Sequence, residues 1–144
     1  MNVLILCTGN SCRSQMAAGI LASLDDRIEV CSAGTYPASR VQPLAIDVMK
    51  EIGVDISGGY PKNVSLYLGE AFDFVITVCD DANETCPAFS GRVGRRIHMG
   101  FEDPSFAIGT REHRLAEFRK VRDLMRADFS RLYTTEILPQ MQKI

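Results

Sequence analysis

The sequence predicts a single α/β domain over residues 1–144, with a parallel sheet flanked by helices. Two short runs of apolar, branched side chains, 3–6 and 72–78, are typical of buried strands. Between residues 3 and 32 a strand, a helical pattern of about a dozen residues and a second strand follow one another. Such a βαβ unit requires parallel strands. The remaining chain contains no repeat, linker or low-complexity segment, so one domain accounts for all of it.

Local signals place the elements along the chain. In chain order we expect strands at 3–6, 27–32, 72–78 and 93–99, and helices at 15–24, 43–52, 63–68 and from 110 to the end. Pro43 suits the first turn of a helix, and Gly53 suits the end of the same helix. Thr110 is a suitable N-cap, and Pro139 is expected to end the last helix or loosen its final turns.

Composition and charge exclude several classes of function. The net charge of −2 and the pI near 5.7 argue against a nucleic-acid surface. The apolar start is too short for a signal peptide or a membrane span, so we expect a cytoplasmic monomer that does not interact with membranes. Five cysteines are then expected to be reduced thiols, and their odd number disfavours a structural disulfide framework.

The stretch from Cys7 to Ser14 carries the first chemical signal. It reads Cys7-Thr8-Gly9-Asn10-Ser11-Cys12-Arg13-Ser14 and turns an expected strand into an expected helix. Backbone N–H groups converge in such a turn and favour an anion. The Cys7 thiol is expected to lose its proton easily there and to act as a nucleophile, with Ser14 donating a hydrogen bond to it. The planar Arg13 side chain can hold two oxygens of a tetrahedral oxyanion.

This C-x5-R-S loop resembles that of the low-molecular-weight tyrosine phosphatase superfamily. The sequence from Cys7 to Ala17 looks more like that of one branch of this superfamily, the arsenate reductases. The oxyanion is then expected on the amides of residues 8 to 13, with Asn10 holding the loop and Cys12 structural or protective. A four-stranded sheet of this class has the order 2-1-3-4, so strands 1 and 3 are neighbours. Their carboxyl ends can bring Cys7 near Cys79.

A second pair of thiols, Cys79 and Cys86, has six residues between its members. If residues 79 to 86 formed a helix, its ends would lie about 10 Å apart, too far for a disulfide. Pairing of the two thiols would therefore require the segment to loop or unwind. His98 is a further potential ligand, but the spacing lacks the C-x2-C pattern of common zinc sites, and we expect no metal.

The resemblance to thioredoxin-coupled arsenate reductases becomes close here. It rests on Thr77-Val78-Cys79, Cys86-Pro87, Ser32-Ala33-Gly34-Thr35 and Gly100-Phe101-Glu102-Asp103-Pro104. It implies that arsenate is reduced by three thiols through the successive disulfides Cys7–Cys79 and Cys79–Cys86. Asp103 would be the general acid, and reduced thioredoxin the electron donor, with no bound cofactor. Phosphate and sulfate would compete, some phosphatase activity could remain, and Ala18 departs from a cation site of some members.

Two alternatives stay open at this point. A low-molecular-weight tyrosine phosphatase needs only Cys7, Arg13 and Asp103, which would leave Cys79 and Cys86 without a role. A non-catalytic oxyanion or redox sensor could bind through the same loop and switch at the second pair of thiols. Asp103 could also form a simple Asx turn before Pro104.

Overall fold

The computed structural model describes residues 1–80 and 86–143 and contains the expected parallel sheet. The strands are β1 (Asn2–Cys7), β2 (Glu29–Gly34), β3 (Phe72–Thr77) and β4 (Val93–His98). All pairings are parallel and the strand order is β2-β1-β3-β4, which confirms the predicted 2-1-3-4 order. Because β1 lies between β2 and β3, the carboxyl ends of three strands surround the segment that follows β1.

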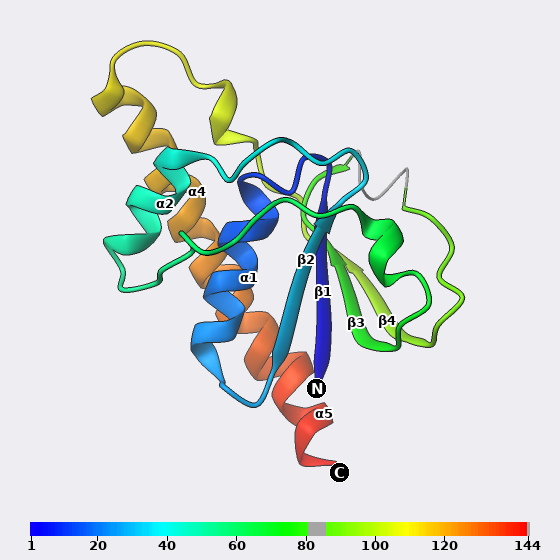
Figure 1. The fold of residues 1–144 in the computed structure, drawn as a ribbon. Helices are drawn as coiled ribbons and strands as arrows, with labels where there is room; N and C mark the ends of the chain where they lie inside the picture. Colours follow the sequence, from blue (N-terminus) through cyan, green and yellow to red (C-terminus); the bar gives the residue numbers. More distant parts are fainter. Residues whose placement is uncertain (81–85, 144) are drawn as a thin grey trace.

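Three longer helices cover one side of the sheet (Figure 1). They are α1 (Arg13–Leu24), α2 (Pro43–Lys50) and α4 (Arg111–Leu132). Both termini lie at the bottom of this view, whereas the segment joining β1 to α1 lies at the top. None of the described helices is long and apolar enough to cross a membrane.

Two expected boundaries in the first βαβ unit are wrong by a few residues. Helix α1 begins at Arg13 and not at residue 15, so the predicted loop is shorter than expected. Strand β2 covers 29–34 and not 27–32, because it pairs residue by residue with β1 up to Cys7 and Gly34. The small residues near its end, Ala33 and Gly34, continue the sheet beneath the loop after β1.

Helix termini follow the expected chemistry. The Thr110 side chain accepts a hydrogen bond from the His113 N–H and caps α4. Gly53 has φ 77°, and it follows α2 in a turn closed by a hydrogen bond from the Val54 N–H to the Met49 carbonyl. Beyond α4 the chain stays helical but changes register in a π-helix, Tyr133–Ile137, which precedes α5 (Leu138–Gln142). The π-helix accommodates Pro139, which cannot donate an intrahelical hydrogen bond.

Short 3-10 helices form at Val64–Tyr67 and Pro104–Phe106. The first replaces the short helix expected over 63–68. The segment that would have to loop or unwind between the second pair of thiols includes residues 81–85 and lies outside the described residues.

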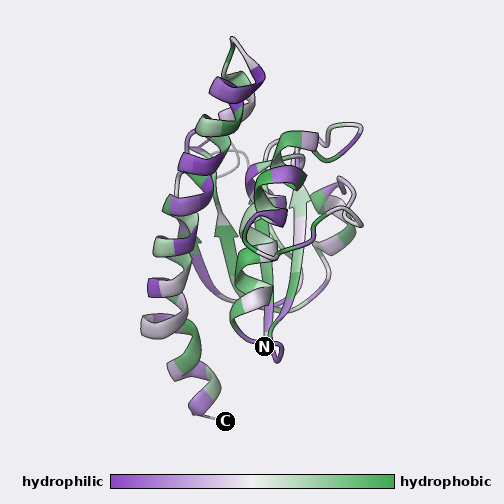
Figure 2. Cartoon of the chain, turned by 90° about the vertical axis from the view of Figure 1, so that its left-hand side faces the viewer, coloured by the Kyte–Doolittle hydropathy of each residue, from purple (hydrophilic) through white to green (hydrophobic). Residues whose placement is uncertain are grey.

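The core lies between the sheet and the helices. Most of its largest fully buried side chains come from β1, β3, α1 and α4, among them Leu4, Ile76 and Phe118. Figure 2 shows the mixed hydropathy of α4 beside the mostly hydrophobic central strands. Cys31, which lies within the strand expected over 27–32, is only partly buried, because β2 is an edge strand of the sheet.

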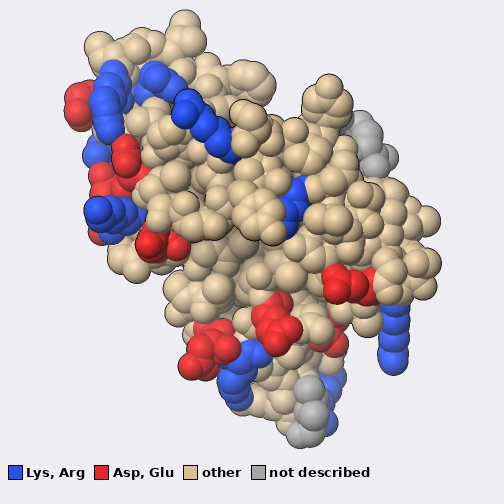
Figure 3. All heavy atoms as spheres, viewed as in Figure 1, with Lys and Arg blue, Asp and Glu red and all other residues tan. Residues whose placement is uncertain are grey.

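Charged side chains of both signs gather over α2 and the start of α4 (Figure 3). Exposed ion pairs join Arg111 to Asp47 and Arg119 to Glu51. Arg122 differs from its neighbours because it is 9% exposed and lies among the apolar residues of α4. Its Nη1 donates to the Val48 carbonyl at 2.9 Å and to Glu51 at 2.7 Å. Arg122 therefore joins α4 to the last turn of α2.

The substitution Arg122→Met tests this connection. It removes the donor that satisfies the Val48 carbonyl, so the free energy of unfolding in urea should fall by about 1–3 kcal/mol. Arg119→Met is the matched control, because Arg119 binds the same carboxylate from an exposed position. It should cost about 1 kcal/mol or less. Equal losses in the two variants would contradict the role given to Arg122.

Candidate active site

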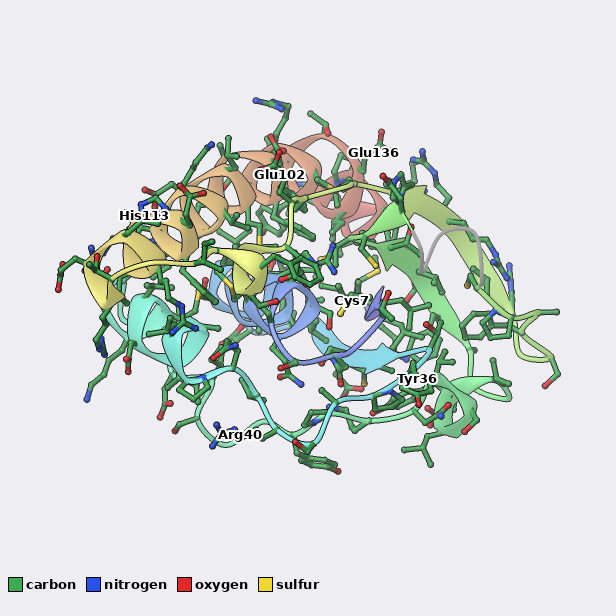
Figure 4. The ribbon with its side chains drawn as sticks, turned by 90° about the horizontal axis from the view of Figure 1, so that it is seen from above. Cys7, Tyr36, Arg40, Glu102, His113 and Glu136 are labelled. Carbon is green, nitrogen blue, oxygen red and sulfur yellow. The ribbon has the colours of Figure 1, made fainter. Side chains whose placement is uncertain are left out.

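The candidate site is the loop between β1 and α1, with Cys7 as the last residue of β1. Seen from above in Figure 4, Cys7 lies near the middle of the molecule, and Tyr36, Arg40 and Glu102 lie farther out. Cys7 is only 2% exposed. Cys12, at the N-cap of α1, makes no capping hydrogen bond through its side chain. The first turn of α1 is thus arranged in the way that suits an anion.

Asn10 sets the shape of this loop. It is fully buried and has φ 49°, a left-handed conformation that asparagine tolerates better than most residues. The Lys62 N–H donates to Asn10 Oδ1 at 2.9 Å, and Asn10 Nδ2 donates to Ser14 Oγ at 2.7 Å. Gln15 Nε2 donates to the Asn10 carbonyl at 3.1 Å. Asn10 is therefore fixed through both its side-chain amide and its backbone carbonyl, and this holds the loop.

The same hydrogen bonds define the direction of the Ser14 hydroxyl. Because Ser14 Oγ accepts from Asn10 Nδ2, its own hydrogen can point at Cys7 Sγ, which lies 2.9 Å away. The Asn10 N–H also donates to Cys7 Sγ at 3.1 Å. A thiolate on Cys7 would therefore have two donors.

Burial opposes ionisation of this thiol. It raises the pKa of Cys7 above the ordinary value, and the hydrogen bonds from Ser14 and Asn10 offset only part of the effect. The expectation that Cys7 loses its proton easily is therefore wrong for the geometry described. The expected cation, Arg13, is directed elsewhere, while the nearby Cys79 thiol raises the pKa further.

Arg13 points toward the loop that follows β4. Its Nη1 donates to the Phe101 carbonyl at 3.2 Å, and its Nη2 lies 3.4 Å from Asp103 Oδ2. The other oxygen of Asp103 accepts from the N–H and the hydroxyl of Ser105, at 2.9 and 2.7 Å. Asp103 thus forms the Asx turn considered from the sequence and also faces Arg13. Both side chains are mostly buried.

The sheet brings Cys79 to the same edge as Cys7. The Val78 N–H donates to the Leu6 carbonyl at 2.9 Å, so the chain after β3 stays beside β1 up to the residue before Cys79. Thr8 Oγ1 lies 3.4 Å from Cys79 Sγ, and Cys79 is 2% exposed. Cys86, in contrast, is partly exposed, and Arg96 Nη1 on β4 lies 3.4 Å from its sulfur.

The remaining loop residues line or support the turn. Ser11 Oγ donates to the Arg40 carbonyl at 2.8 Å, and Gly9 lies near Ala38. The Cys12 thiol lies 3.7 Å from Met16 Sδ, and burial raises its pKa well above the ordinary value. A thiol of this kind stays protonated, which suits a structural role. Within residues 1–80 and 86–143, no three His, Cys, Asp or Glu side chains form a group that could hold a metal ion.

Sequence reasoning missed the residues that support the loop from outside. These are Gln15, Lys62 and the close approach at Gly34. A Cβ atom on Gly34 would lie 2.4 Å from the Thr8 carbonyl oxygen, so only glycine fits beneath the loop. The one available signal was a glycine within a Ser-Ala-Gly-Thr run next to an expected strand.

Comparison with known proteins defines the family. Residues 2–143 match the low molecular weight phosphotyrosine protein phosphatase family, and the chain belongs to it. A protein from Shouchella clausii named arsenate reductase is 45% identical over 122 residues, which cover 84% of this chain and 86% of that protein.

Solved structures show the same relationship. A structure described as an arsenate reductase in the phosphate binding state has a TM-score of 0.78 and 31% identity, covering 92% of this chain and 96% of that one. A thioredoxin-dependent arsenate reductase from Corynebacterium glutamicum has a TM-score of 0.67 and 27% identity. The match covers 96% of this chain and 62% of that protein.

The raised pKa of Cys7 predicts how this thiol reacts as the pH changes. The rate of Cys7 alkylation by iodoacetamide, followed by mass spectrometry, should rise with pH and reach its midpoint above the range of ordinary cysteines. Ser14→Ala removes a donor that lowers the pKa, so its midpoint should lie higher still. Ser23→Ala, on the same helix, is the control and should leave the midpoint unchanged. A wild-type midpoint near neutral pH would contradict the raised pKa of Cys7.

Proposed function

We propose that this protein reduces arsenate to arsenite through a cascade of three thiols and is regenerated by thioredoxin. The observation that carries the proposal is the placement of two buried thiols, Cys7 and Cys79, at the ends of neighbouring strands beside the loop between β1 and α1. A phosphatase needs only the first thiol. The names of the similar proteins point in the same direction.

In the first step arsenate occupies the amides of residues 8 to 13. Arg13 binds its oxygens, and the Cys7 sulfur attacks arsenic. The proton of Cys7 passes to an oxygen of the arsenate, and the donors Ser14 and Asn10 stabilise the thiolate that forms. Asp103 protonates the departing oxygen, which leaves as water. Asp103 contacts Arg13 in the structure, which supports a position for this acid close to the oxyanion that Arg13 would bind.

In the second step Cys79 attacks the Cys7 sulfur. A sulfur–sulfur bond forms and the sulfur–arsenic bond breaks, with its electron pair remaining on arsenic. Arsenic is thereby reduced from As(V) to As(III), and the two thiols are oxidised to a Cys7–Cys79 disulfide. Thr8 contacts the Cys79 sulfur and can position it for this attack.

In the third step Cys86 attacks Cys79 and releases Cys7. The Cys79–Cys86 disulfide that results would be reduced by thioredoxin, so no bound cofactor is needed. We place the protein in the cytoplasm as a monomer, where the thiols are kept reduced. Phosphate and sulfate, which share the shape of arsenate, would compete for the loop.

Tyrosine phosphatase activity is the second candidate, because it would need only Cys7, Arg13 and Asp103, and Arg13 contacts Asp103 in the structure. Arsenite formation with thioredoxin, its reductase and NADPH distinguishes the two. We expect many arsenites per enzyme and slow hydrolysis of an aryl phosphate. Rapid hydrolysis without arsenite would favour the phosphatase, and neither activity would favour a sensor.

The variant Cys86→Ser isolates the third thiol. Without Cys86 the cascade stops at the Cys7–Cys79 disulfide, so about one arsenite per chain should form before turnover ends. Cys31→Ser is the matched control, because Cys31 lies on β2 outside the cascade, and it should sustain turnover. Continued turnover by Cys86→Ser with thioredoxin would remove Cys86 from the mechanism.

A further inference from the structure

The edge strand β4 contacts both ends of the segment between Cys79 and Cys86. Side chains two residues apart on a strand share a face, as Arg96 and His98 do. His98 Nε2 lies 2.8 Å from Asp80 Oδ1, next to Cys79, and its Nδ1 lies 2.8 Å from Thr77 Oγ1. Arg96 Nη1 donates to Cys86 Sγ at 3.4 Å. The same face of β4 thus holds the start and the end of this segment.

The Arg96 guanidinium is held in place by an aromatic ring. Its central carbon lies 5.4 Å from the centre of the Phe89 ring, within the range of a cation–π contact. Phe89 packs edge-on against Phe72, with ring centres 6.4 Å apart, and Phe72 is buried in β3. A chain of contacts therefore runs from the core to the guanidinium and fixes the group that meets the Cys86 sulfur.

Arg95 shows that this placement depends on the strand face. It is the neighbour of Arg96 in the same strand, and its side chain pairs with Glu136 of the C-terminal π-helix. The two arginines have the same chemistry and similar exposure, but only Arg96 contacts a cysteine in the described structure.

We propose that Arg96 is a positioning residue for Cys86. It holds Cys86 in place and stabilises the Cys86 thiolate for attack on Cys79. This inference rests on the proposed function. A guanidinium next to a sulfur favours the charged form that acts as nucleophile. His98 has the complementary task, because its contact holds Asp80, the neighbour of Cys79, on β4 before Cys79 reacts.

The step assisted by Arg96 is a thiol–disulfide exchange. Cys86 gives its proton to solvent, and its sulfur forms a bond with Cys79. The Cys7–Cys79 bond breaks, and Cys7 leaves as a thiolate that takes up a proton. No net oxidation occurs in this step, so no further reactant is required.

The effect of the Arg96 charge on Cys86 can be tested without any substrate. Alkylation of Cys86 in the reduced full-length protein is compared for iodoacetate, which is anionic, and iodoacetamide, which is neutral. In Arg96→Met the ratio of the two rates should fall about three- to tenfold, because the nearby cation attracts the anionic reagent. Arg96→Lys should restore most of the ratio, and Arg95→Met should leave it unchanged. An unchanged ratio in Arg96→Met would overturn the proposal.

A second measurement links the contact to the reaction. After one turnover with arsenate and no reductant, conversion of Cys7–Cys79 into Cys79–Cys86 should be about three- to tenfold slower in Arg96→Met. The arsenite yield of that turnover should equal the wild type, because Cys86 acts after arsenite leaves. Normal conversion would overturn the role of Arg96. If neither the wild type nor any variant forms arsenite, the proposed function itself is rejected.

Discussion

The hydrogen bonds of buried Asn10 are the constraint on which the site depends. A left-handed residue at φ 49° turns the loop back on itself, and its amide connects the Lys62 N–H to the Ser14 hydroxyl. That hydroxyl in turn contacts Cys7 Sγ. One side chain thereby shapes the loop between β1 and α1 and orients the donor that a Cys7 thiolate needs. Such a fully satisfied buried network also has few alternative arrangements, which keeps the loop rigid.

The parallel sheet supplies the second constraint. Because β1 and β3 are neighbours, the residues after them meet at one edge, where Thr8 contacts the Cys79 sulfur. The cost of this arrangement is burial, which raises the pKa of Cys7. The site therefore combines a protected thiol with donors that stabilise its anion. Cys86 lies farther out, against the exposed strand β4, which would suit the proposed transfer of electrons to thioredoxin.

Much of this organisation could be predicted from local sequence patterns. The loop at Cys7 and the cap at Thr110 follow from residues within a few positions of one another, whereas the sheet order was expected from the class of parallel sheet that the sequence resembles. The ionisation of Cys7 could not be predicted, because it depends on how deeply the fold buries the thiol and on where Arg13 points. The same holds for Arg122 and Arg96, whose partners Val48 and Cys86 lie on other elements. Single charges on a helix or strand do not reveal such contacts.

In the proposed mechanism the reaction passes through all three thiols in order. Disulfide mapping by mass spectrometry, after reduced protein is mixed with excess arsenate and no reductant, measures this order. We expect about one arsenite per chain, a disulfide between Cys79 and Cys86, and Cys7 recovered as a thiol. Recovery of all five cysteines as thiols, without arsenite, would contradict it.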